Sequence, residues 1–136
     1  MTAGEVTFSL GAIRVGDLDR SLDFYTGGCG FVLEKRFTTP AFEAAIVRAG
    51  VAGVELIVPH GESATERSDH GNMLQKFVLN TPDPAAVMRR ACEFGGSEVS
   101  PATDYPAYGM TIGVLADPDG YLLELVGRTD DPADPR

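Results

Sequence analysis

The pattern of apolar and polar residues runs along this chain twice. Residues 10–31 (LGAIRVGDLDRSLDFYTGGCGF) are echoed by residues 76–96 (KFVLNTPDPAAVMRRACEFGG). In each copy an alternating, strand-like stretch leads to an aspartate, Asp17 or Asp83, which opens an amphipathic helix that closes in a glycine-rich turn. This duplication predicts two similar modules related by pseudo-two-fold symmetry.

The first copy predicts the element order βαβββ. Residues 6–15 alternate like a strand. Asp17 suits a helix N-cap, because its carboxylate can accept hydrogen bonds from the free N–H groups of the first turn. Leu18, Leu22 and Tyr25 then share one helical stripe. Three short strands are predicted at residues 31–37, 44–48 and 51–58.

The second copy predicts the same order. Asp83 is the predicted N-cap, Pro84 takes the first helical position, and a Gly-Gly pair at residues 95–96 ends the helix. Residues 117–120 (DPDG) supply a tight turn before the last strand. The predicted strands are residues 74–79, 98–102, 110–116 and 121–126.

These elements divide the chain into four segments. A first module (residues 1–58) and a second module (residues 74–127) are separated by a polar linker loop (residues 59–73), and a disordered tail (residues 128–136) follows. Modules of about 65 residues are marginal alone, so we expect them to share one core in a single structural domain of the α+β class.

Strand parity separates an apolar face from a mixed face, because alternate side chains of a strand point to opposite sides. The apolar face predicts the core and carries Ile13, Val15, Val54, Leu56, Val58, Phe77, Leu79, Leu123 and Leu125. The mixed face carries Leu10, Ala12, Arg14, Gly53, Glu55, Ile57, Lys76, Val78, Asn80, Leu122, Glu124 and Val126.

The mixed face favours a ligand cleft. A cleft for a small organic molecule has mainly apolar walls with a few placed polar groups, and Glu55 and Glu124 lie isolated among apolar residues. Leu10, Arg14 and Asn80 are the candidate substrate-binding residues of this face. In the alternative interpretation, the two glutamates are merely solvated residues of exposed strands.

Composition narrows the classes of partner. With 20 acidic and 11 basic residues the chain has a formal charge of -9, which repels nucleic acid and anionic membrane surfaces. No apolar run approaches the roughly 20 residues of a membrane-spanning helix, and the N-terminus lacks a signal-peptide pattern, so we expect a cytoplasmic protein. Cys29 and Cys92 lack CxxC spacing and are expected to be free thiols.

Four motifs, spread over nearly the whole chain, carry a family resemblance. They are residues 14–25 (RVGDLDRSLDFY), 30–31 (GF), 53–56 (GVEL) and 117–125 (DPDGYLLEL). Together they resemble the vicinal oxygen chelate superfamily, which includes glyoxalase I, bleomycin-resistance proteins and extradiol dioxygenases. The resemblance implies two βαβββ modules that form paired half-barrel sheets around a cleft, and a homodimer. The exposed edges of two open half-sheets give a physical reason for the homodimer.

The resemblance also implies where a metal would bind. Metal-dependent members take ligands from the first and last strands of each module; these positions are Leu10, Glu55, Lys76 and Glu124. Leucine has no donor atom and a lysine ammonium is positive, so only Glu55 and Glu124 remain as ligands for a divalent metal. Because a zinc site normally takes three or four protein ligands, we expect no cofactor. His60 and His70 lie in the linker, where either could fold back as a ligand, but solvated side chains are the simpler interpretation.

Three functions fit this incomplete site, each with a small molecule as partner. The first is a glyoxalase-like lyase or isomerase in which Glu124 or Glu55 removes a proton next to a carbonyl. Lys76 or Arg14 then stabilises the developing oxyanion. The second is a non-catalytic drug- or metabolite-binding protein resembling the bleomycin-resistance proteins. The third is a metalloenzyme that uses both glutamates, a loop histidine and water. Whether Lys76 pairs with both glutamates or leaves one free distinguishes the first two.

Overall fold

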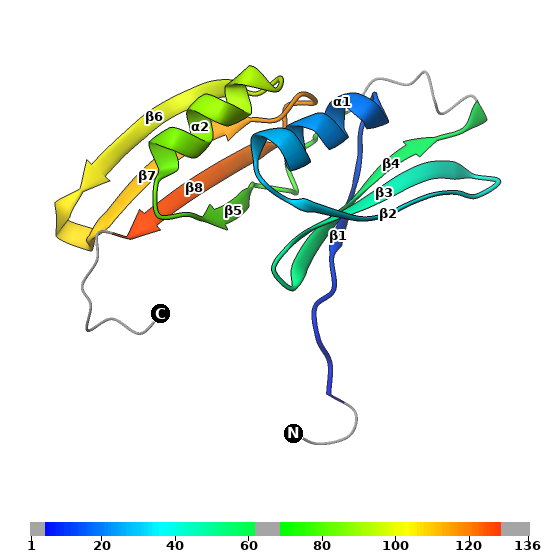
Figure 1. Cartoon of the computed structure of the whole chain (residues 1–136), viewed down its shortest axis with the longest axis horizontal. Coiled ribbons are helices and arrows are strands. Elements are labelled where there is room, and N and C mark those ends of the chain that lie inside the picture. Colours follow the sequence, from blue (N-terminus) through cyan, green and yellow to red (C-terminus); the bar gives the residue numbers. More distant parts are fainter. Residues whose placement is uncertain (1–4, 62–68, 129–136) are drawn as a thin grey trace.

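Two four-stranded mixed sheets form the protein. The computed structural model describes residues 5–61 and 69–128, and within them each copy of the sequence pattern forms one sheet (Figure 1). The strand orders, β1-β4-β3-β2 and β5-β8-β7-β6, are the same permutation. The predicted α+β fold, built from two related modules, is therefore confirmed.

The modules contain equivalent elements in the same sequence order. The first has β1 (Gly11–Arg14), α1 (Leu18–Leu22), a π-helical segment η1 (Asp23–Gly28), β2 (Val32–Thr38), β3 (Phe42–Ala49) and β4 (Ala52–Pro59). The second has β5 (Phe77–Asn80), α2 (Pro84–Glu93), β6 (Ser97–Tyr105), a short 3₁₀ turn η3 (Pro106–Tyr108), β7 (Met110–Ala116) and β8 (Leu122–Arg128). In each sheet the first strand is parallel to the last, whereas the other neighbours are antiparallel.

Both predicted helix N-caps are present. Asp17 accepts a hydrogen bond from the N–H of Arg20 at 3.0 Å, and Asp83 accepts one from the N–H of Ala86 at 3.1 Å. Each bond satisfies a backbone donor that the first helical turn leaves unpaired.

The helix of the first module widens after Leu22, where the sequence predicts one regular stripe. Thr26 Oγ1 donates to the carbonyl of Leu22 at 2.6 Å, and the N–H of Cys29 donates to the carbonyl of Phe24, five residues back. Within this π-helical segment the adjacent Phe24 and Tyr25 are both fully buried.

The first strand is shorter than its apolar pattern predicts. The pattern extends over residues 6–15, but only Gly11–Arg14 pairs with β4. Because β4 begins at Ala52 and Val54 lies opposite Gly11, residues before position 9 have no residue of β4 beside them. A strand pattern alone does not reveal where its partner begins.

Other boundaries also differ from the prediction. β5 begins at Phe77 instead of residue 74. Arg128, expected as the first residue of the disordered tail, is the last residue of β8, because β7 extends to Met110 and offers a strand neighbour opposite it. The rest of the predicted tail, residues 129–136, lies outside the described residues.

The helices cover one face of the sheets, and the modules share one core. That core contains the predicted apolar face, with Ile13, Val15, Val54, Leu56, Leu123 and Leu125 buried and Val58, Phe77 and Leu79 packed against them. Close contact between η1 and α2 joins the two halves. A Cβ atom added to Gly28 would lie 3.1 Å from the Cα of Ala91, so a larger residue would require the two segments to move slightly apart.

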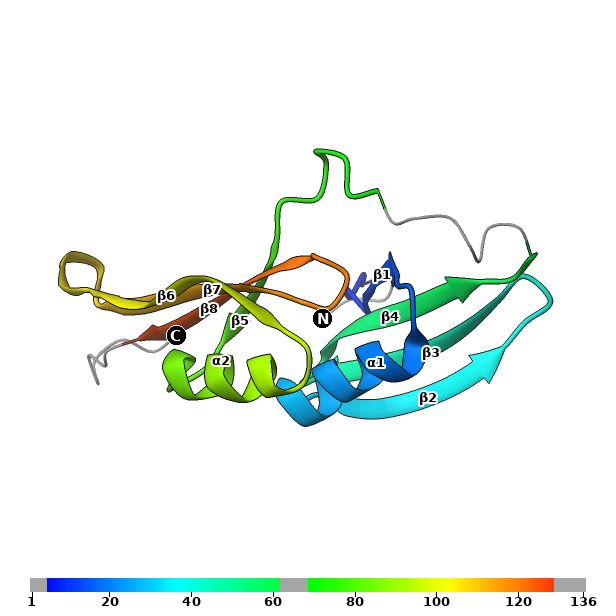
Figure 2. The same ribbon diagram turned by 90° about the horizontal axis from the view of Figure 1, so that it is seen from above.

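The molecule is elongated, with one sheet toward each end. Figure 2 shows both helices along the same long side, while the sheets lie beside one another rather than stacked. Residues 69–76, which lead into β5, lie on the side opposite the helices (Figure 2). The longest helix in the described part of the chain, α2, has 10 residues, about half of what crossing a bilayer requires.

Candidate functional site

Glu55 lies in the middle of β4, on the sheet face that points away from the helices. Its neighbours across the ladder are Ala12 of β1 and Ile46 of β3, and the next residue, Leu56, points into the core with no exposed surface. Glu55 is half-buried, and it has no hydrogen-bond or ion-pair partner among residues 5–61 and 69–128. It is therefore an unpaired carboxylate on a mainly apolar surface.

Glu124 occupies the equivalent place in the second sheet. It lies in the middle of β8 between Val78 of β5 and Val114 of β7, and the next residue, Leu125, is fully buried. We call the helix-free side of each sheet, with Glu55 or Glu124 at its centre, the glutamate face. The sequence prediction that both glutamates occupy equivalent positions opposite the core is confirmed.

Among the described residues, Lys76 pairs with Glu124 and not with Glu55. The Nζ atom of Lys76 lies 2.5 Å from Oε1 of Glu124, with side-chain exposures of 38% and 18% respectively. Because the pair is partly solvated, its net stabilisation is modest, at about 1 kcal/mol or less. Its main effect is to compensate the charge of one glutamate and not that of the other.

The structure spreads the predicted substrate-binding residues over both modules. Leu10 precedes β1 and is half-buried. Arg14 ends β1 opposite Ile57, and its carbonyl accepts a hydrogen bond from the Tyr121 hydroxyl. Asn80 ends β5, where it is exposed.

A cavity of about 260 Å³ lies between the modules. Its lining includes Phe77 and Val78 of β5 from the second module, and Tyr25, Phe31 and Gly53 from the first module. A neighbouring cavity of about 450 Å³ shares Phe31 and Val78 and reaches Asn80. Neither cavity is lined by Glu55 or Glu124.

Within one chain, the described residues do not join the two glutamates. Glu55 and Glu124 belong to different sheets, and no hydrogen bond, ion pair or cavity described above connects them. Of the predicted catalytic residues, Lys76 and Glu124 are brought together, whereas Glu55 lies apart from both. Their catalytic roles stay predictions.

The residues present do not fit a divalent metal. Leu10 offers no donor atom, and the ammonium of Lys76 occupies the space beside Glu124 where a cation would bind. No group of three or more His, Cys, Asp or Glu side chains in the described ranges could hold an ion. His70 lies at the turn of residues 117–120, where its Nε2 is 2.7 Å from the carbonyl of Asp119.

Cys29 lacks the properties of a nucleophile. Burial, followed by the charge of Asp117, raises the pKa of its thiol to about 12. The thiol therefore stays protonated near neutral pH, whereas a reactive cysteine needs a low pKa. This agrees with the interpretation of Cys29 as a free thiol without a role.

Sequence reasoning missed two buried acids. Residues 117–120 are correctly predicted as a turn, but Asp117 is only 3% exposed, and the side chain of Asp119 is 6% exposed. Both contact residues of the first module that precede them by about 100 positions. The sequence feature that points to these two acids is the DPDG motif, which does not reveal that they contact the first module.

Comparisons with known proteins agree with the fold. The sequence profile of the Glyoxalase/Bleomycin resistance protein/Dioxygenase superfamily matches residues 7–125. The lactoylglutathione lyase of Salmonella typhimurium is 30% identical over 87% of this chain and 90% of its own length. The enzyme of the same name from Neisseria meningitidis serogroup A is 32% identical over 85% of this chain and 86% of its own length.

A solved structure also agrees with the fold. Glyoxalase I from Zea mays superposes on 92% of this chain with a TM-score of 0.78 and 27% identity. The chain corresponds to 46% of the maize protein, about half its length. On the strength of the profile match and the bacterial relatives, this chain belongs to the Glyoxalase/Bleomycin resistance protein/Dioxygenase superfamily.

Proposed function

We propose that this protein is a glyoxalase-like lyase or isomerase that moves a proton next to a carbonyl without a metal. The observation that carries the proposal is the unequal environment of the two glutamates: Lys76 pairs with Glu124, and Glu55 has no partner in the described residues. An unpaired carboxylate on an apolar surface suits a general base. The relatives named lactoylglutathione lyase support the same class of reaction.

The substrate class that fits is the adduct of a 2-oxoaldehyde with the thiol of glutathione. Glu55 removes the proton from the carbon that bears the sulfur and the hydroxyl group. The Lys76 ammonium has two further N–H donors, which stabilise the negative charge on the carbonyl oxygen. The proton returns to the neighbouring carbon and the hydroxyl proton passes to the former carbonyl oxygen, so that a thioester forms and no atom is gained or lost.

We further propose that the working unit is a homodimer. Glu55 and Lys76 belong to sheets that lie side by side in one chain (Figure 2), so a cleft that contains both requires a second copy. In this dimer, the glutamate face that carries Glu55 in one copy packs against the glutamate face that carries Glu124 in the other copy. Burial of the apolar residues around each glutamate supplies the driving force.

The homodimer is tested by light scattering after size-exclusion chromatography. We expect twice the chain mass of 14.4 kDa at micromolar concentration. A strictly monomeric protein that turns over substrate would contradict the shared cleft. The cytoplasmic location expected from the sequence stays a prediction.

The reaction is tested by mixing methylglyoxal, glutathione and purified, untagged protein and following thioester formation. We expect turnover that persists after treatment with a chelator, with less than about 0.1 equivalent of metal per chain, because one tightly held ion would give about one equivalent. Activity that requires added zinc or nickel would refute the metal-free reaction.

The alternative is a non-catalytic binding protein for a cationic drug or metabolite. The apolar cavity between the modules and the formal charge of -9 favour it. Titration calorimetry with a cationic glycopeptide such as bleomycin distinguishes the two. Micromolar or tighter binding, unchanged by Glu55→Gln, together with no turnover of the glutathione adduct, would replace the catalytic proposal.

A further inference from the structure

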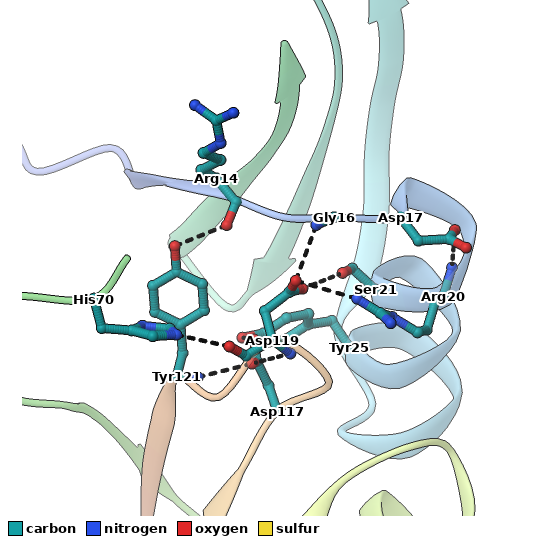
Figure 3. Close-up of polar contacts among 10 residues, drawn as sticks. All are labelled: Arg14, Gly16, Asp17, Arg20, Ser21, Tyr25, His70, Asp117, Asp119 and Tyr121. Carbon is teal, nitrogen blue, oxygen red and sulfur yellow. Dashed lines mark hydrogen bonds and ion pairs between the residues drawn. The ribbon is translucent and has the colours of Figure 1, made fainter. Parts of the chain in front are cut away.

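The side chains of one turn join the two modules. The turn at residues 117–120 links β7 to β8 of the second module and lies against the end of β1 and the first turns of α1 and η1 (Figure 3). A separate contact, from Nε of Arg90 to the carbonyl of Gly27, joins the helices elsewhere. Within the described residues, the hydrogen bonds between the modules are therefore concentrated at this turn.

Among the side chains of this turn, Asp119 makes three hydrogen bonds to the first module and Asp117 makes one. Oδ1 of Asp119 accepts hydrogen bonds from the N–H of Gly16 at 2.9 Å and from Nη2 of Arg20 at 3.1 Å. Its Oδ2 accepts one from the hydroxyl of Ser21 at 3.3 Å (Figure 3). All three donors belong to the first module, so a single side chain of the second module fixes a backbone atom and two side chains of its partner module.

Residues on either side of Asp119 strengthen the junction. Asp117 accepts a hydrogen bond from the Tyr25 hydroxyl at 2.7 Å, and the Tyr121 hydroxyl donates to the carbonyl of Arg14 at 2.7 Å. His70 holds the turn from the linker, since its Nε2–H donates to the Asp119 carbonyl and its ring packs edge-on against Tyr121 (Figure 3). The bond between Tyr25 and Asp117 is buried, and the other bonds of the cluster are partly buried or exposed. Mutually supporting bonds hold one geometry more firmly than isolated ones.

The first module has no equivalent of this junction. Its corresponding turn joins β3 to β4, with Ala49 paired to Ala52 and Val51 between them 90% exposed. Duplication of the module therefore does not by itself explain the buried acids. The second copy differs from the first at this turn.

The junction lies on a short path between the two glutamate faces. Asp119 precedes Glu124 by five residues on the strand side of the turn, and Gly16 follows Ala12 by four residues. Ala12 is the cross-strand neighbour of Glu55. Few residues therefore separate the Asp119 contacts from either glutamate.

We propose that Asp119 is a positioning residue, which sets the orientation of one glutamate-bearing sheet relative to the other. The expected effect of Asp119 on catalysis rests on the proposed function, whereas its expected effect on the orientation of the modules does not. Displacement of a reacting group by about 1 Å can cost a hundredfold in rate. Loss of Asp119 is therefore expected to lower kcat/KM about ten- to a hundredfold, although Asp119 does not contact the substrate.

The test measures the distance between the modules. Spin labels on cysteines at Val32 of β2 and Val99 of β6, both exposed, report that distance in a chain that carries Cys29→Ala and Cys92→Ser. Labelled chains are diluted with unlabelled chains so that only distances within one chain are seen. We expect Asp119→Ala to broaden or shift the distance distribution relative to the parent.

Two variants control for loss of folding and for weakening of α1. Asp119→Asn keeps an acceptor for Gly16 and is expected to restore the parent distribution and most of the kcat/KM. Asp17→Ala removes the N-cap bond to Arg20 within the same helix, but no bond between modules, and is expected to keep the parent distribution. An unchanged distribution in Asp119→Ala, or equal broadening in Asp17→Ala, would overturn the proposal. A parent protein without turnover refutes the proposed function alone, because the distance measurement needs no substrate.

Discussion

Glu55→Gln is expected to lower kcat for the glutathione adduct by about 10²- to 10⁴-fold, the usual contribution of a general base. Glutamine has nearly the same shape but cannot accept the proton. Because Glu55 forms no hydrogen bond or ion pair within the described residues, the substitution breaks no such bond. The melting temperature should therefore stay close to that of the parent, and initial rates at saturating substrate provide the measurement.

The matched control is Glu98→Gln, which changes an exposed strand glutamate in β6. It is expected to keep full activity, so that a general effect of charge can be excluded. Glu124→Gln is expected to slow the reaction through Lys76, which would lose its ion-pair partner. A fully active double variant, Glu55→Gln with Glu124→Gln, would refute the role of both carboxylates.

The sequence predicts the fold well where local patterns are sufficient. Both N-cap aspartates, the strand at residues 110–116 and the core faces of β4 and β8 follow from hydrophobic period and capping chemistry. The opening strands are less well predicted. Their length depends on where β4 and β8 begin, and that is set by pairing between distant segments.

The candidate site is predicted in part. Parity correctly assigns Glu55 and Glu124 to the face opposite the core. The sequence leaves open whether Lys76 pairs with one glutamate or both, and within the described residues it pairs with Glu124. Parity does not determine how two sheets are arranged in space. The expectation that one cleft contains both glutamates therefore stays a prediction, because in one chain they lie on separate sheets.

The contacts of Asp117 and Asp119 with the first module could not be predicted from the sequence, for a related reason. A DPDG turn looks the same whether its carboxylates face water or a second module. Only the tertiary structure brings Asp117 to Tyr25 and Asp119 to Gly16. The burial of these two acids and the identity of their partners therefore cannot be predicted from a single sequence.

Asp117→Ala is expected to lower the free energy of unfolding by about 3 to 5 kcal/mol. The Asp117 carboxylate accepts hydrogen bonds from the N–H groups of Asp119 and Tyr121 and from the Tyr25 hydroxyl. Each buried donor left without an acceptor costs about 1–3 kcal/mol. Tyr25 is only 1% exposed, and burial raises the pKa of its phenol, so it stays a donor that water cannot readily satisfy.

Asp117→Asn separates the hydrogen bonds from the charge. The amide oxygen still accepts from both N–H groups, and the amide nitrogen can donate to Tyr25, so the expected loss at acidic pH is about 1 kcal/mol or less. Burial raises the pKa of Asp117 above its ordinary value of 3.8, despite the opposing hydrogen bonds from Tyr25, Tyr121 and Asp119. The folded protein therefore binds the Asp117 proton more tightly than the unfolded chain does.

This difference in proton binding between the folded and unfolded states determines how stability changes with pH. Between pH 3.8 and the raised pKa of Asp117, the folded state holds more protons at this position, so its contribution to stability falls as the pH rises. Above the raised pKa the contribution is constant. Urea unfolding of parent and Asp117→Asn, at one fixed protein concentration and a series of pH values, isolates the effect, because the other carboxyl groups are common to both proteins. The parent should lose stability relative to the variant across that window, and a difference that stays flat or changes in the opposite direction would show that burial does not dominate the Asp117 environment.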